Sequence, residues 1–204
     1  MHNQQPEQGF TESNHMGHEQ NHASHSLLEA QAAIGSIITT IEQSILYEHH
    51  IQDQQLMQIA QKHRTYLQGL YNTLVDTYRS GQDPAVPTQT YTMGESTNAI
   101  YGTQPGAPKS PATSPQEIND ECVSGFLLDG LKMLSTGFTT AALEATNPVM
   151  RRIFADSVPN IIEMAYEMFL YENKQHYYQL PQLQKADEET LLNSFAPMQG
   201  NTTH

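Results

Sequence analysis

The sequence predicts an all-α protein, a four-helix bundle made from two antiparallel helical hairpins that a long crossover joins. Two observations support this prediction. Four long segments repeat apolar residues at three- and four-residue spacing, which is the spacing of one face of a helix. The two segments of each half are separated only by a short turn, whereas residues 81–114, between the halves, are rich in proline and lack such a repeat.

The first predicted helix begins at Ser26, which forms a capping box with Glu29 three residues later. Residues 1–25 carry no lysine or arginine and are rich in glutamine and histidine, so they are predicted to be a disordered arm. The helix repeats apolar residues along one stripe, which is expected to face the core: Leu27, Ile34, Ile38, Ile41 and Ile45.

The second predicted helix runs from the N-cap residue Asp53 to Ser80, where Gly81 supplies a C-terminal stop. One face of it is expected to be buried: Leu56, Ile59, Ala60, His63, Leu67, Leu70 and Leu74. Because only a short turn separates the two helices, residues 26–80 are predicted to form an antiparallel hairpin. Within the crossover, the segments around Tyr91 and Ile100 are the apolar anchors expected to attach it to the fold.

The third helix is predicted to open at Ser114, because Ser114 and Glu117 form a capping box around Pro115. Its apolar face follows from the spacing: Val123, Leu127, Leu131, Leu134, Phe138, Ala141 and Ala145. The fourth helix starts at Asn147 and ends near Tyr178, again with one apolar face: Ile153, Phe154, Val158, Ile161, Ala165, Met168 and Phe169.

Residues 26–178 are therefore predicted to form one bundle, in which the crossover 81–114 makes a ferritin-like connection between hairpins 26–80 and 115–178. Residues 179–204 are expected to be a polar, acidic tail with at most a short helix around 188–195.

Composition excludes several classes of function. The 9 basic and 22 acidic residues give a net charge of −13, which argues against binding to nucleic acid or to an anionic membrane surface. No apolar run approaches the roughly 20 residues of a membrane span, so membrane insertion is not expected. A single cysteine, Cys122, excludes an internal disulfide framework and any site built from several cysteines. It is expected to fill space beside the core, with an intermolecular disulfide as the alternative.

A ferritin-like bundle raises the alternative of a metal-binding or oxidoreductase protein. Di-iron bundles need inward-facing Glu-x-x-His pairs, and here that spacing occurs only before residue 26. Glu163 and Glu167 are predicted to lie on a solvated face, and His63 to be a satisfied core histidine, with a His63–Glu42 pair conceivable. We therefore predict no enzyme activity and no catalytic, cofactor-binding or metal-binding residues in the bundle.

The N-terminal arm holds a second candidate for metal chemistry. If the arm were helical, four histidines would share one face and could hold Zn²⁺, Ni²⁺ or Cu²⁺: His15, His18, His22 and His25. The alternative is a polar arm whose histidines become charged below about pH 6.5. The ten tyrosines and many glutamines would also suit enzymatic cross-linking.

The second hairpin resembles the spore coat protein F family over residues 115–180. The resemblance rests on a glutamate, an Asn-Pro turn, an arginine and a phenylalanine at a helix–helix junction, here Glu144, Asn147-Pro148, Arg151-Arg152 and Phe154. Met150 replaces the family's leucine, and the aromatic pair Tyr177-Tyr178 ends the helix.

This resemblance implies a non-catalytic, ferritin-like bundle that a spore-forming Bacillus-type bacterium makes in the mother-cell cytoplasm and deposits in the spore coat. The implied partners are other spore coat proteins and further copies of the chain. The family has no established catalytic residues, so none is carried over.

Overall fold

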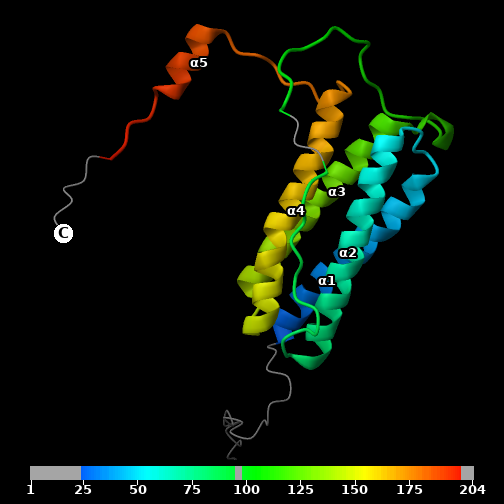
Figure 1. The fold of residues 1–204 in the computed structure, drawn as a ribbon, viewed down its shortest axis with the longest axis vertical. Helices are drawn as coiled ribbons and strands as arrows, with labels where there is room; N and C mark the ends of the chain where they lie inside the picture. Colours follow the sequence, from blue (N-terminus) through cyan, green and yellow to red (C-terminus); the bar gives the residue numbers. More distant parts are fainter. Residues whose placement is uncertain (1–23, 95–97, 199–204) are drawn as a thin grey trace, which may run out of the picture.

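The computed structural model of the chain describes residues 24–94 and 98–198. These residues form four long helices (Figure 1): α1 (Ser24–Glu48), α2 (Gln54–Ser80), α3 (Asp120–Glu144) and α4 (Pro148–Lys174). A short 3-10 turn, η1 (Pro115–Glu117), precedes α3, and a short helix, α5 (Lys185–Leu192), follows α4. The all-α class is thus confirmed. Nowhere in the described part of the chain is a helix long and apolar enough to cross a lipid bilayer.

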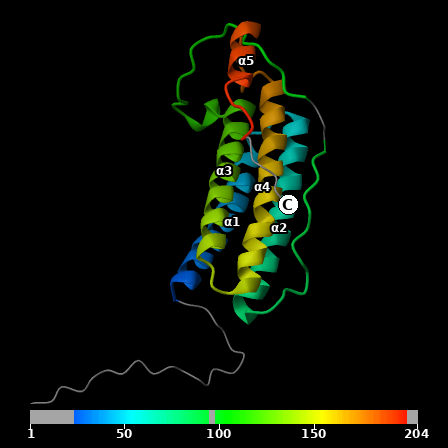
Figure 2. The ribbon, with the colours of Figure 1, turned by 90° about the vertical axis from the view of Figure 1, so that its left-hand side faces the viewer.

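The four long helices pack around a shared core. α1 lies against α2 and α3, while α4 lies against α3 and α2. The two helices of each hairpin run in opposite directions, and α2 and α4, which come from different hairpins, lie side by side (Figures 1 and 2).

Local signals place the ends of α2 and α4 as predicted. Asp53 Oδ1 accepts hydrogen bonds from two backbone N–H groups of the first turn of α2, and Asn147 Oδ1 does the same for α4. Gly81 has the left-handed φ of 68° that follows many helices, and its N–H donates to Thr77 O at 2.7 Å.

The predicted start of the third helix is wrong by several residues. Residues after Ser114 form only η1, and α3 begins at Asp120, with Asn119 as its N-cap. The Ser114 side chain does not cap a backbone N–H, because its hydroxyl donates to Glu117 instead. Asn119 Oδ1 accepts from Cys122 N at 3.1 Å, and two acidic residues follow it in the first turn, where the helix dipole favours them.

The predicted core stripe of α1 is also wrong, by about one residue around the helix. Ile38 is 39% exposed and Ile45 is 49% exposed. The buried stripe of α1 instead carries mostly small residues: Ala30, Ala33, Ile37, Thr40 and Ser44. Both stripes have helical spacing, and small side chains allow the neighbouring helices, with their bulkier leucines and phenylalanines, to approach α1 closely.

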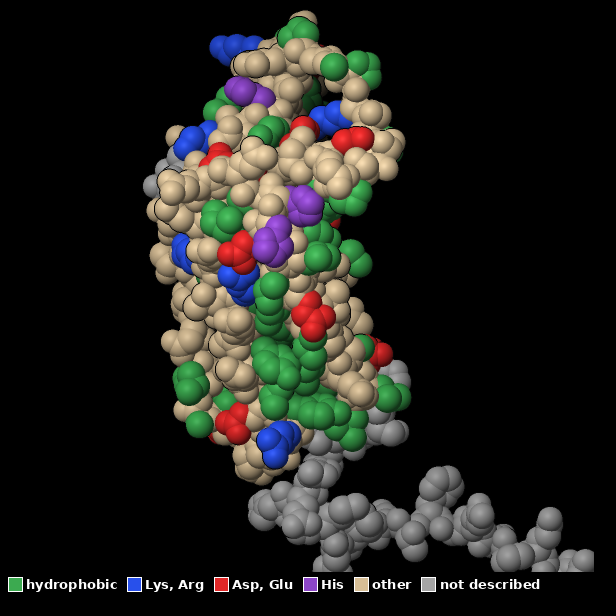
Figure 3. All heavy atoms as spheres, turned by 90° about the vertical axis from the view of Figure 1, so that its right-hand side faces the viewer, with side chains coloured by type: hydrophobic (Ala, Val, Ile, Leu, Met, Phe, Trp, Pro, Cys, Tyr) green, Lys and Arg blue, Asp and Glu red, His purple; other side chains and the backbone are tan. Residues whose placement is uncertain are grey.

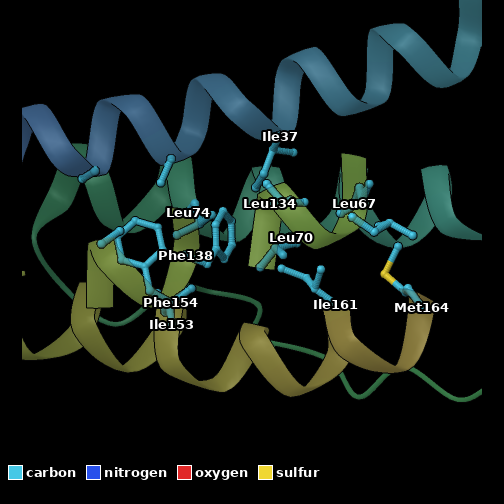
Figure 4. Close-up of a cluster of buried hydrophobic side chains, with 14 of the residues drawn as sticks. Ile37, Leu67, Leu70, Leu74, Leu134, Phe138, Ile153, Phe154, Ile161 and Met164 are labelled. Atoms are coloured by element: carbon cyan, nitrogen blue, oxygen red, sulfur yellow. The ribbon is translucent and has the colours of Figure 1, made fainter. Parts of the chain in front are cut away.

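The core consists of two apolar clusters, one toward each end of the bundle. The larger cluster joins the first half of α1 and α4 to the second half of α2 and α3, and Figure 4 shows Ile37, Leu74, Phe138 and Phe154 converging within it. The smaller cluster gathers Leu56, Val123 and Met168 with their neighbours at the opposite end.

The crossover follows the length of the bundle beside α2 and α4 (Figures 1 and 2). The Tyr66 hydroxyl of α2 donates to Gln89 O at 2.8 Å, and Tyr91 is buried. Farther along, Asn173 of α4 bonds both the N–H and the C=O of Ile100. The predicted anchors at Tyr91 and Ile100 are therefore confirmed, the first through burial and the second through hydrogen bonds.

Candidate functional site

The residues singled out in the sequence for metal or thiol chemistry do not form a site in the described chain. His15, His18 and His22 lie outside the described residues, and the structure describes only the backbone of His25. Cys122 is a half-buried free thiol in the first turn of α3. Within the described ranges, no three side chains of the histidine, cysteine, aspartate or glutamate type come together as a metal-binding group.

A polar cluster surrounds the carboxylate of Glu167, which is 4% exposed in the middle of α4. Its Oε2 atom lies 3.0 Å from Nε2 of His63 on α2 and accepts a hydrogen bond from the Tyr91 hydroxyl. Its Oε1 atom accepts from the backbone N–H of Gly94 at 2.6 Å and lies 3.3 Å from the ammonium of Lys62. We call these five residues the crossover clasp.

Helical spacing brings the clasp residues together. His63 lies between Ala60 and Leu67 on the buried face of α2, at the level where the two apolar clusters meet. Asn160 and Glu167 are seven residues apart, so they share one face of α4. Asn160 Oδ1 accepts from Tyr91 N at 2.7 Å, and this bond sets Tyr91 in position for Glu167.

The clasp holds Glu167 ionised beside a neutral histidine. Burial by itself would raise the pKa of Glu167, but hydrogen bonds from His63, Tyr91 and Gly94 lower that pKa to about 2. Burial lowers the pKa of His63, an effect that the Glu167 carboxylate opposes only in part. Burial, and then the same carboxylate, raise the pKa of the Tyr91 hydroxyl far above its ordinary value. Lys62 also lies 4.7 Å from the centre of the Tyr91 ring.

The prediction that Glu167 lies on a solvated face is wrong, whereas Glu163 is exposed as predicted. The prediction considered only the bundle face of α4, and the crossover covers a second face. A sequence signal for this burial exists, because Met164, Leu170 and Tyr171 surround Glu167 at three- and four-residue spacing. His63 is buried as predicted, but its carboxylate partner is Glu167, since Glu42 is exposed.

A pocket of about 230 Å³ lies beside the clasp. Glu167, Lys62 and Gly94 form part of its wall, and the remaining residues come from α2 and α4: Gln55, Gln58, Ile59, Leu170 and Tyr171. The side chain of Lys62 is 39% exposed, so solvent reaches the clasp at this residue.

The clasp is suited to holding the crossover on the bundle. Each oxygen of Glu167 faces two groups of the chain itself, which satisfies the carboxylate. A carboxylate with so low a pKa is a weak proton acceptor near neutral pH, where a general base works best with a pKa close to the ambient pH. The arrangement therefore acts as a hydrogen-bond anchor between α2, α4 and the crossover.

Comparisons with known proteins agree on one family. The Coat F domain matches residues 119–181, a range that contains Asn160, Glu167 and Asn173. The chain is 36% identical over 176 residues to the spore coat protein F-like protein YhcQ of Bacillus subtilis strain 168, which covers 86% of this chain and 81% of that protein. No solved structure matches the chain.

Proposed function

Because the chain belongs to the spore coat protein F family, we propose that it is a structural component of the bacterial endospore coat with no catalytic activity of its own. The observation that carries this proposal is the 36% identity to a spore coat protein F-like protein over 86% of the chain. The satisfied carboxylate of the crossover clasp supports the same role, because its donors all belong to the chain.

We also propose the division of labour within the chain. Residues 26–178 form the bundle, whose single long crossover makes the ferritin-like connection, and the course of that crossover along α2 and α4 supports this assignment. Residues 1–25 and 179–204 are the polar segments that contact other coat proteins and further copies of the chain. The protein is made in the mother-cell cytoplasm and assembles onto the forespore.

The test is localisation in a sporulating cell. A fluorescent fusion of the full chain is expected to surround the forespore and to remain with the released spore, whereas the fluorescent protein alone stays diffuse. A fusion that is diffuse in vegetative cells and absent from the forespore surface contradicts the proposal.

A further inference from the structure

The isoleucines that the sequence places in the core of α1 line the outside of the bundle. Ile38 and Ile45 are exposed, and the neighbouring members of the strip are only partly buried: Ile34, Ile41, Tyr71 and Tyr78. We call these six residues the isoleucine strip. Figure 3 shows hydrophobic side chains in a nearly continuous band on the face of the molecule that α1 and α2 form.

A second apolar segment of the chain also lacks a partner. Helix α5 packs against no other helix of the described chain, and residues 181–198 are exposed throughout. We call residues 181–198 the C-terminal arm. Its apolar side chains are among the most exposed of the chain: Leu183, Leu191, Leu192, Phe195 and Met198. A helix of two turns is marginal in water without a surface to pack on.

From these two surfaces we propose that the C-terminal arm of one copy docks on the isoleucine strip of a second copy. Leu191, Leu192 and Phe195 occupy positions i, i+1 and i+4 around the end of α5 and would anchor it on the strip.

Charge favours one end of the strip. The first turn of α5 carries Asp187 and Glu188, whereas Arg79 is exposed in the last turn of α2, next to Tyr78 of the strip. The acidic end of the arm therefore complements the basic end of the strip, in a chain whose net charge of −13 otherwise opposes contact between copies.

The length of the arm favours docking between copies. The chain is tied at Leu180, whose carbonyl accepts from Gly102 N at 2.8 Å, and five extended residues beyond it reach at most about 18 Å. The eight residues of α5 add about 12 Å. The 27-residue α4 is about 40 Å long, and Figure 1 places α5 at the end of the bundle opposite the last turn of α2. The arm thus falls short of Arg79 in its own copy.

Docking of an arm on a strip joins two different surfaces, so it leaves one arm and one strip free on every pair. Such a head-to-tail contact adds copies without a fixed end point. The inference deepens the self-association in the proposed function by naming its two surfaces, and it can be tested without spores.

The experiment measures the size of the full-length protein by sedimentation velocity over a range of concentrations at pH 7. The wild type is expected to form species that grow beyond a dimer. The arm variant Leu191→Ser/Phe195→Ser and the strip variant Ile38→Glu are each expected to associate at least about tenfold more weakly. The control Met133→Glu, which changes a residue 76% exposed on α3, is expected to associate like the wild type. Circular dichroism checks that each variant is folded.

Mixing the two defective variants distinguishes the proposed contact from a strip-to-strip dimer. The arm variant keeps an intact strip and the strip variant keeps an intact arm, so an equal mixture is expected to form one-to-one pairs that do not grow further. A monomeric wild type, an arm variant that associates normally, or a mixture that stays monomeric would each overturn the inference. If the wild type is monomeric but its fusion surrounds the forespore, the docking inference fails while the proposed coat function stands.

Discussion

Glu167 links three parts of the chain through one side chain. It contacts His63 of α2 and two crossover residues, Tyr91 and Gly94, from its place on α4. A buried carboxylate is costly unless its hydrogen bonds are satisfied, so the energetic value of Glu167 depends on these donors staying in place. Its loss would also leave their own polar atoms unpaired.

We expect Glu167→Gln to lower the free energy of unfolding by about 2–3 kcal/mol, because an amide carries no charge and offers only one acceptor oxygen to four neighbours. Urea denaturation followed by circular dichroism measures this change. Glu163→Gln, one turn earlier and exposed, is the matched control and should stay within about 0.5 kcal/mol of the wild type. Equal effects of the two substitutions would show that the clasp does not stabilise the fold.

The stabilisation by Glu167 should also depend on pH. Since its pKa is lowered from 4.5 to about 2 in the folded protein, the stability it contributes is complete above pH 4.5 and is lost as the pH falls toward 2. The difference in unfolding free energy between wild type and Glu167→Gln is therefore expected to be largest near pH 5 and to shrink between pH 4.5 and 2. A difference that stays constant down to pH 2 would assign the effect to packing and not to charge.

At the scale of the helix, α1 carries two apolar stripes with the same period. One consists of isoleucines, and the other consists of small residues that pack against α2 and α3. Periodicity shows that α1 is a helix, but it does not show which stripe the neighbouring helices cover. Bulk decides this, because the buried stripe must fit against the leucines and phenylalanines of the other helices.

Two substitutions test which stripe of α1 is the core. Ala33→Leu adds bulk at a residue that is 4% exposed and is expected to lower the unfolding free energy by about 1–3 kcal/mol. Ile38→Ala removes bulk from the isoleucine strip and should cost less than about 1 kcal/mol, because that side chain is already 39% exposed. Thermal and urea unfolding of both variants give the comparison, and the opposite order would place the isoleucines in the core.

At the scale of the whole molecule, the bundle and its exposed segments have separate tasks in the proposed function. The two apolar clusters and the crossover clasp between them hold the four long helices together. The isoleucine strip and the C-terminal arm contribute little to that core and are free to contact other copies. Variants of the arm should therefore change the assembly of copies while the bundle stays folded.

The sequence by itself determined the all-α class, the caps at Asp53 and Asn147, and the anchors of the crossover at Tyr91 and Ile100. Each of these depends on interactions within one turn of helix or on a local change of composition, so neighbouring residues suffice to predict it. The start of α3 was harder to predict, because Ser114 and Asn119 are both plausible caps and only Asn119 leads directly into the packed helix.

Only the tertiary structure decided that Glu167 is buried and that the isoleucines of α1 are not. Both outcomes depend on which segment covers a given helix face, and that segment lies far away in the sequence. The crossover covers the Glu167 face of α4 and brings Tyr91 and Gly94 to its carboxylate, while no described segment covers the exposed edge of the isoleucine strip. Burial is a property of contacts between distant residues, and helical periodicity alone does not specify those contacts.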